Sequence, residues 1–223
     1  MIKKIAIVML LMTSVAVSSV VAQKNGDLPA QNSAIQHYGS NILRLNPITA
    51  MDIGVGFGLS YEKILGSEQK VGLIFPVSMI IQNKENFDYL AGSYNNARYN
   101  TYVYFTPGVK IYPFGQRKVT YAVGPNLMFA YGGGNEYQYR TDAYGGAYLD
   151  NVKSTRVRLG LLANNYVNFQ ISRSFNIGLE GGLGLRYYDK QTFSGSAFYA
   201  GNGDISNGFD ISGQFSVSLG LRF

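Results

Sequence analysis

The sequence contains no cysteine and no tryptophan, and it has one histidine, His37. An exported chain without cysteine has no disulfide framework, so its fold must be held by hydrogen bonding and burial. Charged residues make up only 14% of the chain, whereas about a quarter is usual for a soluble domain. The surface is therefore small, or it faces something other than water.

The scarcity of histidine limits the chemistry that can be expected. Catalysis by a Ser-His-acid arrangement needs a histidine beside the nucleophile, and His37 precedes the first predicted strand. Two glycine-rich runs, GVGFG (54–58) and GGLGLR (181–186), do not match the dinucleotide fingerprint. The run GNGDISNGFD offers oxygen ligands but lacks the closing Glu of a calcium loop. We expect no enzyme activity, no cofactor and no metal site.

The amino-terminal residues carry the features of an export signal. Lys3 and Lys4 precede an apolar run, and small residues lead up to Ala22. This pattern predicts a signal peptide over residues 1–22, followed by a polar periplasmic lead-in over residues 23–40. Removal of the two lysines lowers the formal charge of +6 by two. Export argues against nucleic acid as a partner and favours anionic lipid.

Apolar and polar residues alternate through much of the remaining chain. From Phe209 to Phe223, every second residue is apolar or Gly. The same period recurs in seven earlier segments, near residues 41–46, 53–62, 71–81, 101–112, 119–131, 156–171 and 176–187. Successive side chains of a strand point to opposite faces, so each segment has one apolar face and one polar or small face. The sequence predicts eight strands.

The predicted connections alternate between short turns and long loops. The short ones are 65–70, 113–118 and 172–176, and the long ones are 83–98, 132–154 and 189–208. The connection 46–52 is a short exception on the loop side. All turns then lie at one end of the sheet, which we call the turn end, and both termini share it. The loops lie at the other end, the loop end.

The charges of these segments lie on the faces that carry Gly and Ser, while the opposite faces are almost free of charge. A soluble sandwich or lipocalin-like barrel would place its charges outside. An eight-stranded barrel has an interior just wide enough for side chains, so charges beside small residues fit inside it. The apolar faces then contact hydrocarbon. The sequence predicts an all-β fold, a transmembrane antiparallel up-and-down β-barrel of eight strands over residues 41–223.

Outward-facing aromatic residues are expected at both ends of this barrel. Tyr61, Tyr121, Phe169 and Phe223 lie near the turn end, and Tyr131, Tyr187 and Phe209 lie near the loop end. Two aromatic girdles around an aliphatic band are typical of bacterial outer-membrane barrels.

The export signal, the eight-strand pattern and the terminal Phe223 together resemble the small outer-membrane β-barrel proteins of the OmpA/OmpX type, in the porin-like superfamily. The resemblance implies location in the bacterial outer membrane, with outer-membrane lipid and lipopolysaccharide as surroundings. It also implies that Phe223, with Leu221, Leu219 and Val217, is the assembly signal read by the barrel-insertion machinery.

Several charged residues are predicted to face the lumen. The expected charge network comprises Arg44, Glu62, Lys110, Glu180 and Arg222. Charge in a narrow interior must be paired, so we expect Glu62 to pair with Lys110 or Arg222, and Glu180 with Arg44.

Three further arginines, Arg156, Arg158 and Arg186, are expected near the loop end. Asp150 and Asp189 are the acids that could neutralise them. If these arginines stay uncompensated, the mouth would attract lipopolysaccharide phosphate or a small anion.

The expected function is that of an integral outer-membrane barrel with a blocked polar lumen. Its long extracellular loops would serve structural, adhesive or surface-binding roles toward a ligand that the sequence does not identify. The alternative is a narrow porin or transporter for small solutes.

Overall fold

A computed structural model of the chain describes residues 38–52, 54–88, 93–141, 144–194, 205–206 and 209–223. The predicted signal peptide 1–22 and the lead-in as far as His37 lie outside these residues. Residues 201–204 and 207–208 of the run GNGDISNGFD lie outside them as well. No helix in the described part of the chain is long and apolar enough to cross a membrane.

The described residues form ten strands. They are β1 (Asn41–Met51), β2 (Gly54–Leu65), β3 (Val71–Asp88), β4 (Ser93–Phe105), β5 (Gly108–Ile111), β6 (Val119–Thr141), β7 (Ala147–Gln170), β8 (Phe175–Ser194), β9 (Ile205–Ser206) and β10 (Asp210–Arg222). β4 and β5 are two parts of one barrel strand, since both lie between β3 and β6. β9 is a two-residue strand that pairs only with β8. The barrel wall therefore has eight strands.

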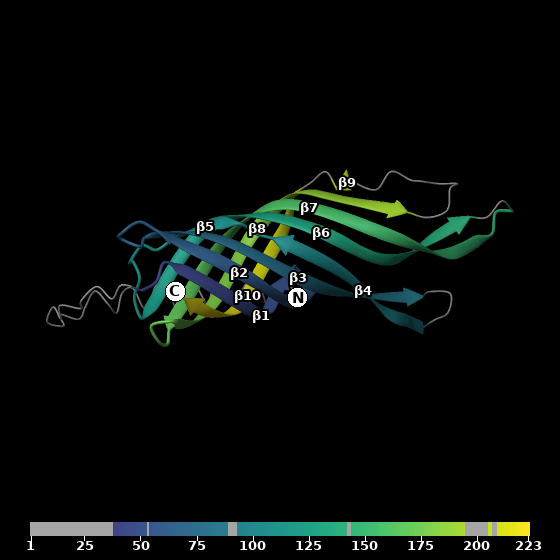
Figure 1. Cartoon of the computed structure of the whole chain (residues 1–223). Coiled ribbons are helices and arrows are strands. Elements are labelled where there is room, and N and C mark those ends of the chain that lie inside the picture. Colours follow the sequence, from purple (N-terminus) through teal and green to yellow (C-terminus); the bar gives the residue numbers. More distant parts are fainter. Residues whose placement is uncertain (1–37, 53, 89–92, 142–143, 195–204, 207–208) are drawn as a thin grey trace, which may run out of the picture. The chain divides into compact units, whose positions relative to one another are not determined.

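Antiparallel pairing closes the sheet on itself (Figure 1). β10 pairs with β8 on one side and with β1 on the other, in a register that runs from Ile42 opposite Arg222 to Met51 opposite Gln214. Backbone hydrogen bonds of 3.0 and 2.9 Å between Asn41 and Phe223 complete the seam at the turn end. The predicted eight-stranded antiparallel barrel is confirmed, and closure leaves no open edge in the wall.

The first strand is longer than the alternation predicts, because β1 continues to Met51. A register shift between Leu45 and Ile48 marks a bulge, and Pro47 and Ile48 both lie exposed on the outer face. Proline is tolerated in a sheet at such bulges. The predicted connection 46–52 is therefore mostly strand.

The long connections also contain much regular structure. β3 and β4 remain paired as far as Asp88 opposite Ser93, and β6 and β7 as far as Thr141 opposite Ala147. In Figure 1 these hairpins extend well beyond the barrel wall. The regions predicted as loops 83–98 and 132–154 are thus mainly hairpin arms.

The outer face of the barrel is apolar, as predicted. Leu59, Leu127 and Leu183 are each about half exposed, and many other aliphatic side chains are exposed beside them. Of the predicted girdle residues, Tyr61, Phe169, Phe223, Tyr131, Tyr187 and Phe209 are all exposed, while Tyr121 is partly exposed. A contiguous apolar surface of this extent fits hydrocarbon and not water.

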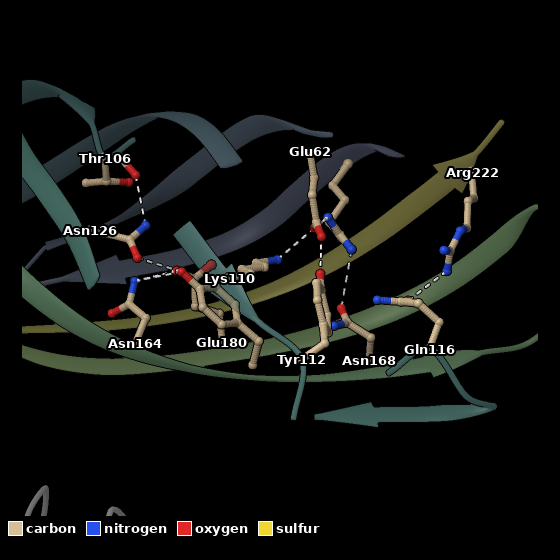
Figure 2. Close-up of polar contacts among 12 residues, drawn as sticks. Glu62, Thr106, Lys110, Tyr112, Gln116, Asn126, Asn164, Asn168, Glu180 and Arg222 are labelled. Atoms are coloured by element: carbon tan, nitrogen blue, oxygen red, sulfur yellow. Dashed lines mark hydrogen bonds and ion pairs between the residues drawn. The ribbon is translucent and has the colours of Figure 1, made fainter. Parts of the chain in front are cut away.

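The wall is interrupted between β4 and β5 at Thr106 and Pro107. Proline has no N–H to donate to a ladder. The neighbouring backbone compensates in part, because the Thr106 N–H donates to the Pro76 carbonyl at 3.0 Å. From inside the barrel, the side-chain amide of Asn126 donates to the Thr106 carbonyl at 2.9 Å (Figure 2). A lumen side chain therefore replaces part of the strand pairing at this break.

Candidate functional site: the filled lumen

The level nearest the turn end is organised around Glu62 of β2, whose side chain is fully buried. Its carboxylate accepts hydrogen bonds from Arg44 of β1, from the Tyr112 hydroxyl, and from Lys110 Nζ at 2.9 Å (Figure 2). A Cβ added to Gly72, opposite Lys110, would lie 3.0 Å from Glu62 Oε1, so this glycine leaves room for the carboxylate. A buried carboxylate with two cations and a phenol around it satisfies the pairing that burial requires.

Glu180 of β8 belongs to a second, neighbouring level. Its Oε1 accepts hydrogen bonds from Asn164 Nδ2 at 2.8 Å and from Gln214 Nε2 at 2.9 Å. In the same level, the Tyr166 hydroxyl donates to Asn126 Oδ1 at 2.8 Å. Two side-chain amides, and not an arginine, thus donate to this carboxylate.

Of the ion pairs predicted for these two levels, one is present and one is absent. The Glu62–Lys110 ion pair is present, as the sequence predicted. The predicted Glu180–Arg44 pair is wrong, because Arg44 bonds to Glu62 and lies 3.5 Å from the amide oxygen of Asn168. Lys110 joins the two levels, since its Nζ lies 4.1 Å from the centroid of the Tyr166 ring.

An apolar level follows toward the loop end. It consists of Met51, Ile80, Tyr102, Tyr104, Met128, Ala130 and Leu162. All seven side chains are almost completely buried. The sequence predicted polar or small residues on the inner face, so this apolar level was not predicted. The feature that could have predicted it is the presence of bulky apolar residues, such as Ile80 and Met128, at inward positions of their strands.

The level at the loop end contains the three predicted arginines and three aspartates. Arg156 binds Asp189 through two nitrogens, one of them at 2.7 Å. Arg186 Nη1 lies 3.1 Å from Asp52, and Arg186 Nη2 lies 2.9 Å from Asp210.

Arg158 completes this level. Its Nη1 donates to the Tyr104 hydroxyl at 2.8 Å and lies 3.4 Å from Asp52 Oδ2. Its Nε lies 3.5 Å from Asp189. Among the described side chains, three positive and three negative ones therefore balance one another at the mouth.

This balance counts against the predicted anion site, which required uncompensated arginines. Asp189 is one of the acids that the sequence suggested, while the side chain of Asp150 is not among those that the structure describes. Asp52 and Asp210 were missed. Asp52 lies in the tight β1–β2 connection with a φ of 53°, a left-handed conformation that Asp adopts more readily than most residues.

Arg222 of β10 lies apart from Glu62 and closes the turn end. Its Nε donates to the Gly39 carbonyl at 2.6 Å, and its Nη1 donates to Gln116 Oε1 at 3.0 Å (Figure 2). Its guanidinium carbon lies 4.8 Å from the Tyr38 ring centroid. Of the two partners predicted for Glu62, Lys110 forms the ion pair and Arg222 bonds elsewhere. The neighbouring Phe223 is exposed on the outer face, and its role as an assembly signal stays a prediction.

A closed barrel with an apolar, aromatic-bordered exterior and a polar, filled interior has the architecture of an outer-membrane β-barrel protein. Two outer-membrane proteins are among the solved structures that share the fold. A major outer membrane protein from Thermus thermophilus has a TM-score of 0.56 at 13% identity, over 82% of this chain and 100% of that one. OprG from Pseudomonas aeruginosa has a TM-score of 0.53 at 10% identity, over 84% of this chain and 97% of that one.

Searches with the sequence found no matching family model and no similar curated protein. At these identities the structural likeness concerns the fold. Together with the lipid-compatible exterior, this fold places the protein in the bacterial outer membrane.

Proposed function

We propose that this protein is an outer-membrane barrel with a blocked lumen, which presents extended hairpins at the cell surface for a structural, adhesive or binding role. The observation that carries the proposal is the stacking of side-chain levels along the lumen. Glu62, Asn164 and Tyr104 belong to three successive levels, and each is 0% exposed.

Several physical features support a blocked lumen. The interior of an eight-stranded barrel is just wide enough for its own side chains. An ion crossing this lumen would have to displace the paired charges around Glu62 and then pass the apolar level around Tyr102 and Met128. Charge transfer into such surroundings is strongly unfavourable.

The hairpins supply the surface-binding part of the proposal. The β6–β7 pair continues without a register shift from Val119 opposite Phe169 to Thr141 opposite Ala147. A rigid hairpin is a suitable carrier for a binding tip. The region 132–154 is rich in Tyr, Asn and Gly, residues that recur in protein-binding loops because they combine contact area with adaptable hydrogen bonds.

Conductance in planar bilayers tests the blocked lumen. We expect no reproducible channel steps from the wild type. A larger outer-membrane barrel with a water-filled lumen serves as the positive control for the bilayer measurement. Regular steps from the wild type would instead support the narrow porin, the second candidate.

Adhesion of cells to serum-protein-coated plates tests the hairpin role. In the test variant, a two-residue Asn-Gly turn replaces residues 135–153. It connects Gly134 and Ser154, which face each other in the register. This change removes the hairpin arm and keeps the barrel register. We expect adhesion to fall to the level of cells that lack the protein, and unchanged adhesion would contradict the role.

A further inference from the structure

The two ends of the barrel differ in charge. The turn end carries six basic side chains, Lys63, Lys70, Arg117, Lys118, Arg173 and Arg222. Among the described residues at this end, Glu68 and the carboxylate of Phe223 oppose them, which leaves a formal excess of four positive charges. In outer-membrane barrels the short turns face the periplasm, so this excess lies at the periplasmic rim.

The loop end is close to neutral by comparison. Its segments, Asp52 with residues 83–98, 132–158 and 186–210, contain eight Lys or Arg and nine Asp or Glu. The arginines of the mouth are also occupied by aspartates, as at Arg186 with Asp210. Of the two ends of the barrel, the turn end therefore carries the excess of basic residues.

Lys118 and Arg173 show how these charges are placed. They lie on neighbouring turns, because the Gln170 N–H donates to the Lys118 carbonyl at 2.7 Å. Both are exposed, and neither has an acidic partner among the described residues. Beside them, Val119 and Ile171 are 55% and 60% exposed on the outer face. The cationic side chains thus lie just beyond the end of the apolar band.

From this arrangement we propose that the periplasmic rim binds the phosphate headgroups of anionic phospholipids in the inner leaflet. The apolar neighbours Val119 and Ile171 contact acyl chains, so Lys118 and Arg173 reach the level of the headgroups. Basic residues at this position are attracted to an anionic lipid surface. A soluble acidic protein fits less well, because its contact would have to include these apolar side chains.

Spin-labelled lipids test the proposal on the folded protein in phosphatidylcholine bilayers. The measured quantity is the association constant of labelled phosphatidylglycerol relative to labelled phosphatidylcholine. We expect a preference for phosphatidylglycerol that disappears in 1 M NaCl, where the screening length is about 3 Å. The variant Lys118→Gln with Arg173→Gln should show a weaker preference, lower by up to about fivefold for each charge removed.

The matched control is Lys153→Gln with Lys190→Gln, which removes the same charge from the loop end. This control should keep the wild-type preference, and heat-modifiable gel mobility shows that both variants are folded. No preference in the wild type, or an equal loss in the control, would overturn the proposal. Displacement of labelled lipid by soluble glycerol phosphate would point to a free-phosphate site and would also overturn it.

Discussion

Lys110 of β5 and Glu62 of β2 lie 48 positions apart in sequence, and their side chains meet inside the barrel with Nζ 2.9 Å from Oε2. Both side chains are almost fully buried. Arg44 contacts the same carboxylate oxygen. Glu62 is therefore the acid on which two buried cations depend.

Replacing Glu62 with Gln should destabilise the barrel by about 3–5 kcal/mol, because two buried cations lose their counter-charge. Chemical unfolding in lipid, followed by circular dichroism, measures the change. Glu68→Gln is the matched control, since Glu68 pairs with Lys70 on the exposed turn and should show no measurable effect. Equal stability of the two variants would refute the assigned role of Glu62.

Replacing Glu180 with Gln should have a smaller effect, about 1 kcal/mol. The new amide oxygen can still accept hydrogen bonds from Asn164 and Gln214. Only the additional strength that the negative charge gives to these bonds is lost. The same unfolding measurement applies. A loss as large as that of the Glu62 variant would mean that the cations depend on Glu180 as well.

Gly182→Ala should destabilise the barrel by about 1–3 kcal/mol, the usual range for overpacking. Its new Cβ would lie 1.7 Å from Asn164 Oδ1 and 3.0 Å from the Ala163 carbonyl oxygen. Gly213→Ala is the control, because its nearest neighbour would be a Leu183 methyl group at 3.8 Å. If both variants unfold at the same denaturant concentration, the lumen is less tightly filled than described.

Single-cysteine labels along β10 should show lipid exposure with a period of two. Ile211, Phe215 and Leu219 lie on the outer face, whereas Ser212 and Ser216 are buried. The natural absence of cysteine makes each label unique. Quenching by nitroxide lipids should be strong at the first three positions and weak at the other two. Uniform quenching along the strand would contradict the orientation of the sheet.

The sequence predicted the barrel wall well because lipid imposes a simple rule on it. A strand between hydrocarbon and a narrow interior must alternate, as Leu219 and Leu221 do around Gly220. The rule failed at Pro47, where a bulge places two successive residues outside and breaks the period. The length of β1 could therefore not be predicted by alternation.

The lumen partners were harder to predict, since alternation gives the face of a side chain and not its reach. Arg44 and Glu180 both point inward, yet the Arg44 guanidinium lies on Glu62. Asp52 was assigned to a connection, and its contact with Arg158 spans 106 positions. Only the closed register of the sheet brings such residues together.

The pairing of β1 with β10 also has a consequence for biogenesis. Asn41 and Phe223 exchange backbone hydrogen bonds across 182 positions, while the other wall pairings join strands that are neighbours along the chain. The ring can therefore close only after the ribosome has made all of its strands. Until then both outermost strands keep unpaired backbone amides, which are open to pairing with the edge of another chain.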